Sequence, residues 1–552
     1  MAWTKNKSRE RVREDLKSLP SVKVQDLRKL IVERALQKRL DEATSSSTAS
    51  EDSLVSIPRS RAVIADTVQV YIDILNFRDV RSKPGAETDE DHSNTLSFLH
   101  LFYSAIDRLI DGSPLRRVDY HDTRVHLVIL RDDDQEVGEE ELSTALRLAY
   151  EVDSVIRKAA NDIFGDRFVP VTRCGIDAGR CIAINNGTKN EPEPLFIGSA
   201  ANKAAKLARG EQGGIALSPR AKRLLRGVAD LSDKEVEFGG FADPLIKSAI
   251  ADSGRREFVE TGAVPIAESF GALSNVRVEK ALNSARKYVS ESYAKSAANV
   301  PAFSFFFKPP PFSDIEFSEL MPSNTIRQPM LTLFADICGY TNFVDRCLEQ
   351  GNPETAVRAL YIIRNELRAV LEQDFDGKKL RFIGDCIEGL SYSGSSKEID
   401  ARVTVAEGIR IAAAMLSSLE VCKDELGDIE DLELSVGLEI GSTPVSRIGI
   451  RGERSVRVAS SNATATAEDS QREAQPGEMI LGQAARALIP DGAQDFINEE
   501  NGTATLHEYS FVAAAIGLPL TESQPNAPSV ITPRAHGVAP KVSSARAHLR
   551  QS

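Results

Sequence analysis

The chain has 552 residues, enough for two or three domains that each bury a core. Hydrophobic residues make up 41% and charged residues 27% of it, which are ordinary globular values, and the formal net charge of −13 argues against non-specific nucleic-acid binding. No apolar run is long enough to span a bilayer, and the six cysteines are scattered without metal-ligand spacing. We therefore expect a cytoplasmic protein that neither binds nucleic acid nor inserts into a membrane.

Residues 1–54 read as a basic N-terminal segment followed by a linker. The run VQDLRKLIVERALQKRL has the apolar spacing of a helix, which we expect to pack on its own domain. The polar stretch TSSSTASEDS that follows is typical of a linker.

Residues 55–231 are expected to form a first domain. The strand VQVYIDIL precedes the helix TLSFLHLFYSAIDRLI, a hairpin around Asp122 and a long helix from Glu140 to Phe164. The strand FVPVTRCGIDAG and the helix AANKAAKLARG complete the pattern. Strands that alternate with helices and hairpins favour an α/β or α+β sandwich with one mixed sheet.

A connector over residues 232–325 separates this domain from a second one over residues 326–516. The connector is expected to contain a helix near VRVEKALNSARKYVSESYAKSA and an extended, proline-rich end, PAFSFFFKPPPF. The second domain repeats the order of the first, from the strand LTLFADI to the strand LELSVGLEIG. The last segment, 517–552, lacks the composition of a core and is expected to be disordered.

The two domains repeat each other with a period of 263 residues. Asp73 and Asp336 lie in corresponding apolar strands, and Asp122 and Asp385 lie in corresponding hairpins, 49 residues further on in each case. A period this long indicates a duplicated domain rather than a solenoid, so both halves should share one fold.

The repeated aspartates indicate a site for hard cations. A carboxylate in an apolar strand is costly unless it has a partner, and Mg²⁺ and Mn²⁺ prefer carboxylate oxygens while they bind triphosphates. Either aspartate alone would be better explained as a helix cap or a hairpin turn. The recurrence of the pair in register favours metal binding.

The second domain resembles a known family at both aspartates. The segments FADICGYTNFVD and FIGDC are similar to the motifs of the class III nucleotidyl cyclases, the adenylate and guanylate cyclase family. The first domain matches weakly, because YIDILNF lacks the glycine and YHDTR lacks the Ile-Gly pair. The resemblance implies the α+β, ferredoxin-like cyclase fold in two tandem pseudo-symmetric domains.

The resemblance also implies a composite site between two domains of one chain. Asp336, Asp385 and the carbonyl of Ile337 would hold two divalent ions, Mn²⁺ or Mg²⁺. From the first domain, Asn202 would orient the ribose and Lys206, where the family usually has Arg, would stabilise the transition state. A nucleoside triphosphate would be bound by the residues of the first aspartate motif, which are Phe334, Gly339, Tyr340 and Thr341. A degenerate second site would contain Asp73, Asp122, Arg180 and Asn462.

The positions that read the base in purine cyclases carry unusual residues. They correspond to Val118 and Leu195 for the composite site and to Arg381 in the second domain, none of which is the usual purine reader. The chain therefore resembles the pyrimidine cyclases of bacterial Pycsar antiphage systems, which implies UTP or CTP as substrate, a 3′,5′-cyclic nucleotide and pyrophosphate as products, and a separate effector that senses the cyclic nucleotide. An adenylate cyclase with atypical base contacts and a nucleotide-binding regulatory pseudo-cyclase remain alternatives.

Overall fold

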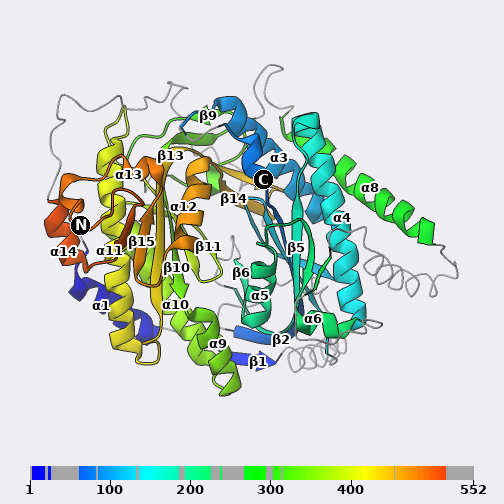
Figure 1. The fold of residues 1–552 in the computed structure, drawn as a ribbon, viewed down its shortest axis with the longest axis horizontal. Helices are drawn as coiled ribbons and strands as arrows, with labels where there is room; N and C mark the ends of the chain where they lie inside the picture. The colour runs from blue at the N-terminus through cyan, green and yellow to red at the C-terminus, as the bar shows by residue number, and fades with distance from the viewer. Residues whose placement is uncertain are drawn as a thin grey trace, which may run out of the picture.

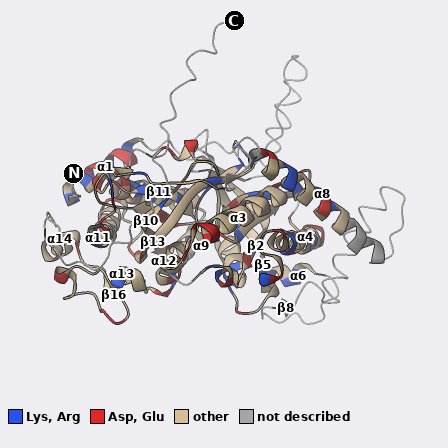
Figure 2. Cartoon of the chain, turned by 90° about the horizontal axis from the view of Figure 1, so that it is seen from above, with Lys and Arg blue, Asp and Glu red and all other residues tan. Residues whose placement is uncertain are grey.

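The computed structural model describes residues 3–18, 23–26, 61–82, 85–131, 136–185, 193–225, 236–238, 267–293, 303–312, 315–452 and 454–517. They form two sheets, each flanked by helices, that lie side by side (Figure 1). Basic and acidic residues are interspersed over the helices of both halves (Figure 2). Within these ranges no helix combines the length and the apolar character that crossing a membrane requires.

The first half is built on β2, the strand that carries Asp73. Alternate β2 side chains such as Val70 and Ile72 pack under α3 and α4, while Asp73 lies on the opposite face. The elements of this half are β1 (Lys23–Asp26), β2 (Arg61–Ile74), η2 (Phe77–Val80), α3 (Asp89–Leu109), β3 (Leu115–His121), β4 (Arg124–Leu130), α4 (Glu139–Phe164), η3 (Gly165–Arg167), β5 (Thr172–Asn185), β6 (Pro194–Ile197), α5 (Ser199–Leu207), β7 (Gly214–Leu217), α6 (Pro219–Leu224) and β8 (Val236–Phe238).

The second half is built in the same way on β10, the strand that carries Asp336. Its elements are β9 (Phe305–Phe306), η5 (Phe317–Glu319), β10 (Thr325–Cys338), α9 (Tyr340–Glu349), α10 (Pro353–Ala369), the π-helix η6 (Val370–Asp374), β11 (Lys378–Ile383), β12 (Cys386–Ser391), α11 (Ala401–Leu426), β13 (Glu433–Gly449), β14 (Ser455–Ala459), α12 (Asn462–Glu473), β15 (Glu478–Leu481), α13 (Gln483–Arg486), η7 (Asp491–Ala493), β16 (Thr503–Thr505) and α14 (Tyr509–Ile516).

The two sheets have equivalent topologies. Their strand orders are β3-β4-β2-β5-β7-β8 and β11-β12-β10-β13-β15-β16. In addition, β1 pairs with β2 and β6 with β5 in the first sheet, and β9 pairs with β10 and β14 with β13 in the second. Every strand of the first sheet thus has a counterpart in the second, and the prediction that the halves share one mixed-sheet α+β fold is confirmed.

Each half inserts a hairpin into the core of the other. Ile182, Leu195 and Ile197 of the β5–β6 hairpin belong to the apolar cluster of the second half. Ile448 and Val458 of the β13–β14 hairpin belong to the cluster of the first half. This exchange of hairpins holds the two sheets together, with the faces that carry the aspartates turned toward each other.

The N-terminal segment differs from the prediction. Residues 23–26, at the start of the run expected to be helical, form strand β1 parallel to β2, because the β2 edge offers backbone partners there. The remainder of that run lies outside the described residues. Helix α1 (Lys5–Ser18) packs against α10 and α11 of the second half, where Trp3 Nε1 donates to Ser418 Oγ at 2.8 Å.

Parts of the connector lie within the described residues. Its predicted helix is present as α8 (Ala267–Tyr293), which packs on α3 and α4 of the first half. The predicted extended end contributes Phe303 and Phe305 to the first core and Phe312 to a small cluster in the second half. The tail beyond Gly517 lies outside the described residues.

Arg11 generates a prediction about the docking of α1. Its guanidinium pairs with Glu366 at 2.6 Å and Asp374 at 2.9 Å, whose side chains are 1% and 0% exposed. Arg11→Ala would leave two buried carboxylates without this partner, so we expect the docked state to lose about 3 kcal/mol. Trp3 is the chain's single tryptophan, so its fluorescence during urea titration reports the undocking.

Arg13→Ala is the matched control, because Arg13 pairs with Glu425 while 58% of its side chain is exposed. Its urea midpoint should stay at the wild-type value, since exposed pairs contribute little. Equal shifts of the urea midpoint in both variants would contradict the conclusion that the buried pairs of Arg11 stabilise the docked α1.

Candidate active site

Asp336 stands near the end of β10, at the face between the halves. The side chains of Leu333 and Ala335 enter the core of the second half, and Asp336 points the other way. Three residues later, Gly339 adopts φ +86°, a left-handed conformation that suits glycine, and α9 begins directly after it. The N–H groups at the start of α9 therefore lie next to the carboxylate.

Asp385 occupies the second position of the two-residue turn between β11 and β12. The pairing of Ile383 with Cys386 closes this turn, and Gly384 supplies the left-handed residue with φ +63°. From α10, Arg364 donates to the Gly384 carbonyl and lies 4.1 Å from the centre of the Phe382 ring. The turn that carries Asp385 is thus supported from the core side.

Asp336 and Asp385 are close enough to repel each other. Burial raises the pKa of both, and the charge of Asp336 raises the pKa of Asp385 further. Within the described part of the chain, neither carboxylate has an ion pair, and only the backbone of Asp385 itself donates to one of them. Two such carboxylates fit hard divalent cations, whose charge offsets this repulsion.

The described ranges contain no group of three or more His, Cys, Asp or Glu side chains arranged around a common metal position. Any cation here would consequently rely on the two aspartates, main-chain oxygen and a ligand. The carbonyl of Ile337 was the predicted third contribution, and Ile337 pairs with Leu434 in the ladder between β10 and β13.

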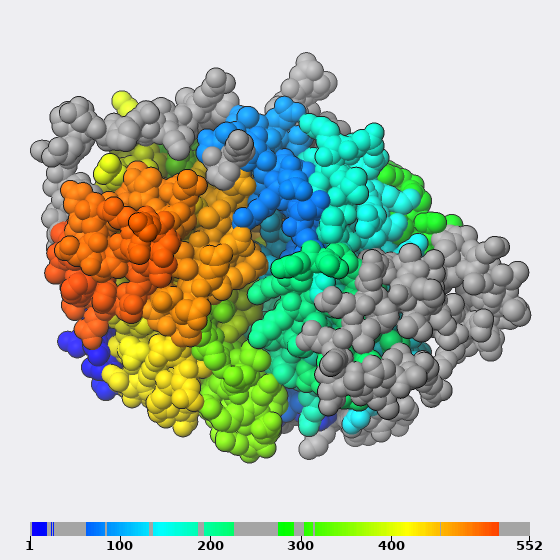
Figure 3. Space-filling model, in the orientation of Figure 1, coloured from blue at the N-terminus to red at the C-terminus, as the bar shows by residue number. Residues whose placement is uncertain are grey.

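Helix α5 of the first half lies across the site from α9. Asn202 Nδ2 donates to Thr341 Oγ1, and the Ser199 backbone N–H donates to Asp345 Oδ1 at 3.1 Å. The space-filling view shows α5, in teal, against α9, in light green (Figure 3). The predicted partners Asn202 and Lys206 are therefore presented to the aspartates from the opposite half, and the charge of Lys206 acts on Asp336.

Two arginines at the site were not predicted from the sequence. Arg364 supports the Asp385 turn from α10, and no family motif marked it. Arg209 follows α5, and its charge acts on both Asp336 and Asp385. The sequence does contain a clue to Arg209, because it follows Asn202 by seven residues and Lys206 by three. Residues at i, i+4 and i+7 share one face of a helix.

Two predicted substrate-binding side chains are buried in the protein. Phe334 is 1% exposed and its ring meets the His121 ring edge-on at 5.9 Å between centroids. Tyr340 is 3% exposed, and its hydroxyl donates to the Ala356 carbonyl at 2.8 Å, which ties α9 to α10. Their side chains shape the walls of the site.

The three residues at the positions predicted to read the nucleotide base are also buried. Val118 packs in a cluster with Phe196, and Leu195 packs with the core of the second half. Arg381, 6% exposed, donates to the Tyr120 carbonyl and lies 3.6 Å from Glu388. The structure therefore places Arg381 in the second composite site, away from Asn202 and Lys206.

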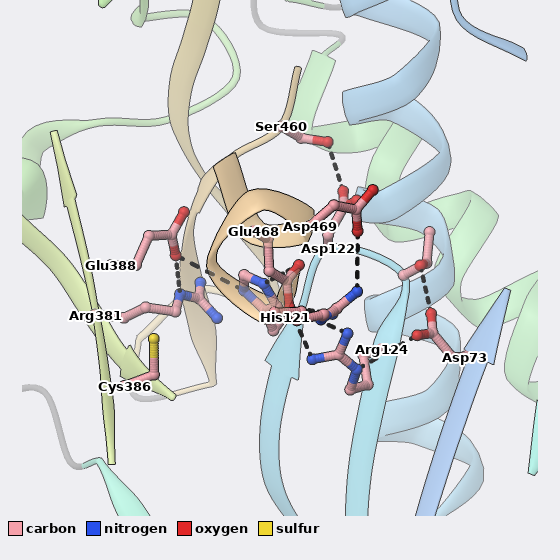
Figure 4. A network of polar contacts seen from close by, with 12 residues as sticks. Asp73, His121, Asp122, Arg124, Arg381, Cys386, Glu388, Ser460, Glu468 and Asp469 are labelled. Carbon is pink, nitrogen blue, oxygen red and sulfur yellow. Dashed lines mark hydrogen bonds and ion pairs between the residues drawn. The ribbon is translucent and has the colours of Figure 1, made fainter. Parts of the chain in front are cut away.

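The second composite site is filled by interactions within the protein (Figure 4). Asp122 accepts from Ser460 Oγ at 2.6 Å and pairs with Arg81 at 3.2 Å. The hairpin turn differs by one residue from its counterpart: His121 pairs with Arg124, so Asp122 takes the first turn position and itself adopts φ +46°. The absence of the Ile-Gly pair accounts for this shift.

Asp73 is likewise bonded to its neighbours. It accepts from Thr123 Oγ1 at 2.7 Å and from the Ile74 N–H at 2.9 Å, and Arg124 lies 3.4 Å away. Arg124 also bonds Glu468 of α12 at 3.2 Å, which joins the two halves. Asn76 stands where the second half has Gly339, and the chain continues into the short η2 instead of a helix like α9.

The remaining two residues of the predicted second site are separated from each other. Asn462 Nδ2 donates to the Ser82 carbonyl at 2.7 Å, close to Arg81. Arg180 pairs across the ladder with Asp66, whereas Asp73 pairs with Arg173, so Arg180 lies about 23 Å along the strand from Asp73. Its side chain is 65% exposed and lies 3.6 Å from Asp26. The structure does not bring Arg180 to the second site.

Comparison with known proteins gives concordant results. Residues 325–502 match the family model described as the adenylate and guanylate cyclase catalytic domain. A uridylate cyclase of a Rhizobium species is 35% identical over 89% of this chain and 91% of its own length. A uridylate cyclase of Pseudomonas aeruginosa is 31% identical over 85% of this chain and 86% of its own length.

A solved structure is also similar over almost the whole chain. It is described as a class III adenylyl cyclase-like ATP-binding protein from Pseudomonas aeruginosa, and the match covers 94% of this chain and 100% of that one, with a TM-score of 0.74 and 27% identity. Together with two aspartates that face an Asn and a Lys on α5 and lack ion pairs within the described ranges, these relationships show that this chain belongs to the class III nucleotidyl cyclases.

Proposed function

We propose that this nucleotide cyclase converts UTP to 3′,5′-cyclic UMP and pyrophosphate. The observation that carries the proposal is the difference between the two aspartate pairs. Asp336 and Asp385 lie opposite Asn202 and Lys206 without ion pairs in the described part of the chain, while Asp73 and Asp122 are bonded to protein donors. One composite site is therefore available to a nucleotide.

The residues of this site would divide the work of cyclisation. Asp336 and Asp385, with the Ile337 carbonyl, would hold two divalent ions, Mn²⁺ or Mg²⁺, which supply charge neutralisation and activation of the ribose 3′-oxygen. The N–H groups at the start of α9 would bind phosphate oxygens. Asn202 would orient the ribose, and Lys206 would stabilise charge on the α-phosphate.

The preference for uracil is supported by the base positions and the relatives. Val118 and Leu195 provide apolar packing where purine cyclases carry polar readers, and both curated relatives are uridylate cyclases. CTP is the nearest alternative. The similar solved structure is described as ATP-binding, so an adenine nucleotide is the other candidate that a specific observation favours.

The cyclic nucleotide would act as a second messenger in antiphage defence. This part of the proposal rests on the resemblance to Pycsar cyclases and includes a separate effector that senses the product. It is tested by exposing cells that carry the gene with its neighbours to phage and measuring cyclic UMP.

The substrate is tested by incubating purified protein with each of the four ribonucleoside triphosphates and Mn²⁺ and resolving the products by mass. We expect a cyclic pyrimidine monophosphate as the main product, with UTP preferred over CTP. Predominant cyclic AMP would overturn the argument from Val118 and Leu195, and absence of any cyclic product would favour a regulatory pseudo-cyclase.

The two aspartate pairs should respond differently to substitution. Asp336→Asn or Asp385→Asn should lower kcat by about 1,000-fold or more, because a metal clamp contributes several kcal/mol. Asp73→Asn and Asp122→Asn are the matched controls and should keep kcat within about threefold of wild type. Equal losses from both pairs would contradict the assignment of a single active site.

The site should form within one chain. The contact between Asn202 and Thr341 joins the two halves of the same molecule, and intramolecular pairing has the higher effective concentration. A mixture of Asp336→Ala and Asn202→Ala proteins should therefore stay inactive. Recovery of cyclisation in the mixture would indicate a domain-exchanged dimer.

A further inference from the structure

Helix α5 presents a continuous polar face to the aspartates. Asn202, Lys206 and Arg209 follow one another at i, i+4 and i+7, so their side chains lie on one side of the helix. The Arg209 N–H donates to the Lys206 carbonyl at 3.1 Å, which extends the helical turn to Arg209. The opposite side, with Ala204 and Leu207, is buried, and the Arg209 side chain is exposed.

Arg209 is positioned between the two halves of the active site. Arg209, Arg472 and Lys206 lie close enough for their charges to act on Asp336 and lower its pKa. It is also the cation that reaches Asp385 from the opposite half.

Arg209 differs from the neighbouring arginines in its partners. Arg124 bonds Glu468 and Asp73, and Arg472 pairs with Asp469 at 3.2 Å. Among the described residues the Arg209 side chain has neither a hydrogen bond nor an ion pair. Burial and the charges of Arg124 and Arg472 lower its pKa to about 10 against the opposing charges of Glu468 and Asp73, so it remains charged at neutral pH. A cation without a direct protein partner in the described ranges is available to a group that gains negative charge during the reaction.

We propose that Arg209 is a catalytic residue whose guanidinium contacts the α-phosphate during cyclisation. The inference rests on the proposed function and identifies a group that compensates for the Lys at position 206. A lysine offers a single point charge, whereas the planar guanidinium donates two parallel hydrogen bonds to a phosphate.

The step is a substitution at phosphorus. The ribose 3′-oxygen forms a bond to the α-phosphorus, and its proton passes to solvent. The bond between that phosphorus and the bridging oxygen of pyrophosphate breaks, and the electron pair leaves with pyrophosphate. Negative charge on the phosphoryl oxygens rises during this exchange, which gives Arg209 a stronger interaction in the transition state than in the bound substrate.

The test compares the kinetics of Arg209→Ala, Arg209→Lys and Lys203→Ala with whichever triphosphate the wild-type protein cyclises best. Arg209→Ala should lower kcat about 100-fold while KM changes less than about threefold, because the lost contact forms mainly in the transition state. Arg209→Lys should recover part of kcat. Lys203 lies on α5 about 100° away from the shared face, and Lys203→Ala should retain wild-type kinetics.

Binding of the corresponding 3′-deoxynucleoside triphosphate, measured by calorimetry, provides a readout that chemistry does not affect. Arg209→Ala should bind it with wild-type affinity, which also shows that the variant is folded. Unchanged kcat in Arg209→Ala, or loss of binding with kcat retained at saturation, would overturn the catalytic role of Arg209 while leaving the cyclase function intact. If wild-type protein cyclised none of the four triphosphates, both the proposed function and this role would fall.

Discussion

The repulsion between Asp336 and Asp385 is the interaction on which the rest of the site depends. Two carboxylates held close together in partly desolvated surroundings are unfavourable unless cations approach them. The surrounding structure keeps them in place: Gly339 turns the chain directly into α9, Gly384 shapes the hairpin turn, and Arg364 holds that turn from below. From the other half, α5 brings positive charge toward the same point. The fold thus creates a site where divalent metal ions can offset the charge of the carboxylates and bind the oxygens of a triphosphate.

In the second composite site, the corresponding carboxylates Asp73 and Asp122 interact with protein groups. Asp122 pairs with Arg81 and accepts a hydrogen bond from Ser460, while Asp73 pairs with Arg124 and accepts a hydrogen bond from Thr123. The changes are small in sequence, since two missing glycines alter one helix start and one turn. Their effect is large, because both carboxylates now bond protein groups and are no longer available to a ligand. The second site has become part of the interface that fixes the first.

Much of this organisation is predictable from the sequence because the duplication marks it. The period of 263 residues locates both sheets, and the glycines beside Asp336 and Asp385 distinguish the intact motif from the eroded one. The sequence could not show that residues 23–26 pair with β2, because an edge strand depends on a partner that is distant in the chain. The family resemblance implies a place for Arg180 in the second site, but the ladder register puts it far along β5 from Asp73. Arg209 was missed because its role depends on what lies opposite α5.

The exchanged hairpins have a consequence for how such an enzyme can change over time. Because β5–β6 and β13–β14 each complete the core of the other half, neither half has a full set of apolar contacts by itself. In an assembly of two identical chains, every substitution would appear on both sides of the interface and in both sites at once. Here the halves share a single backbone, and a substitution affects one side only. Each half is free to lose what the other retains, and the enzyme can specialise one site while it converts the other into structure.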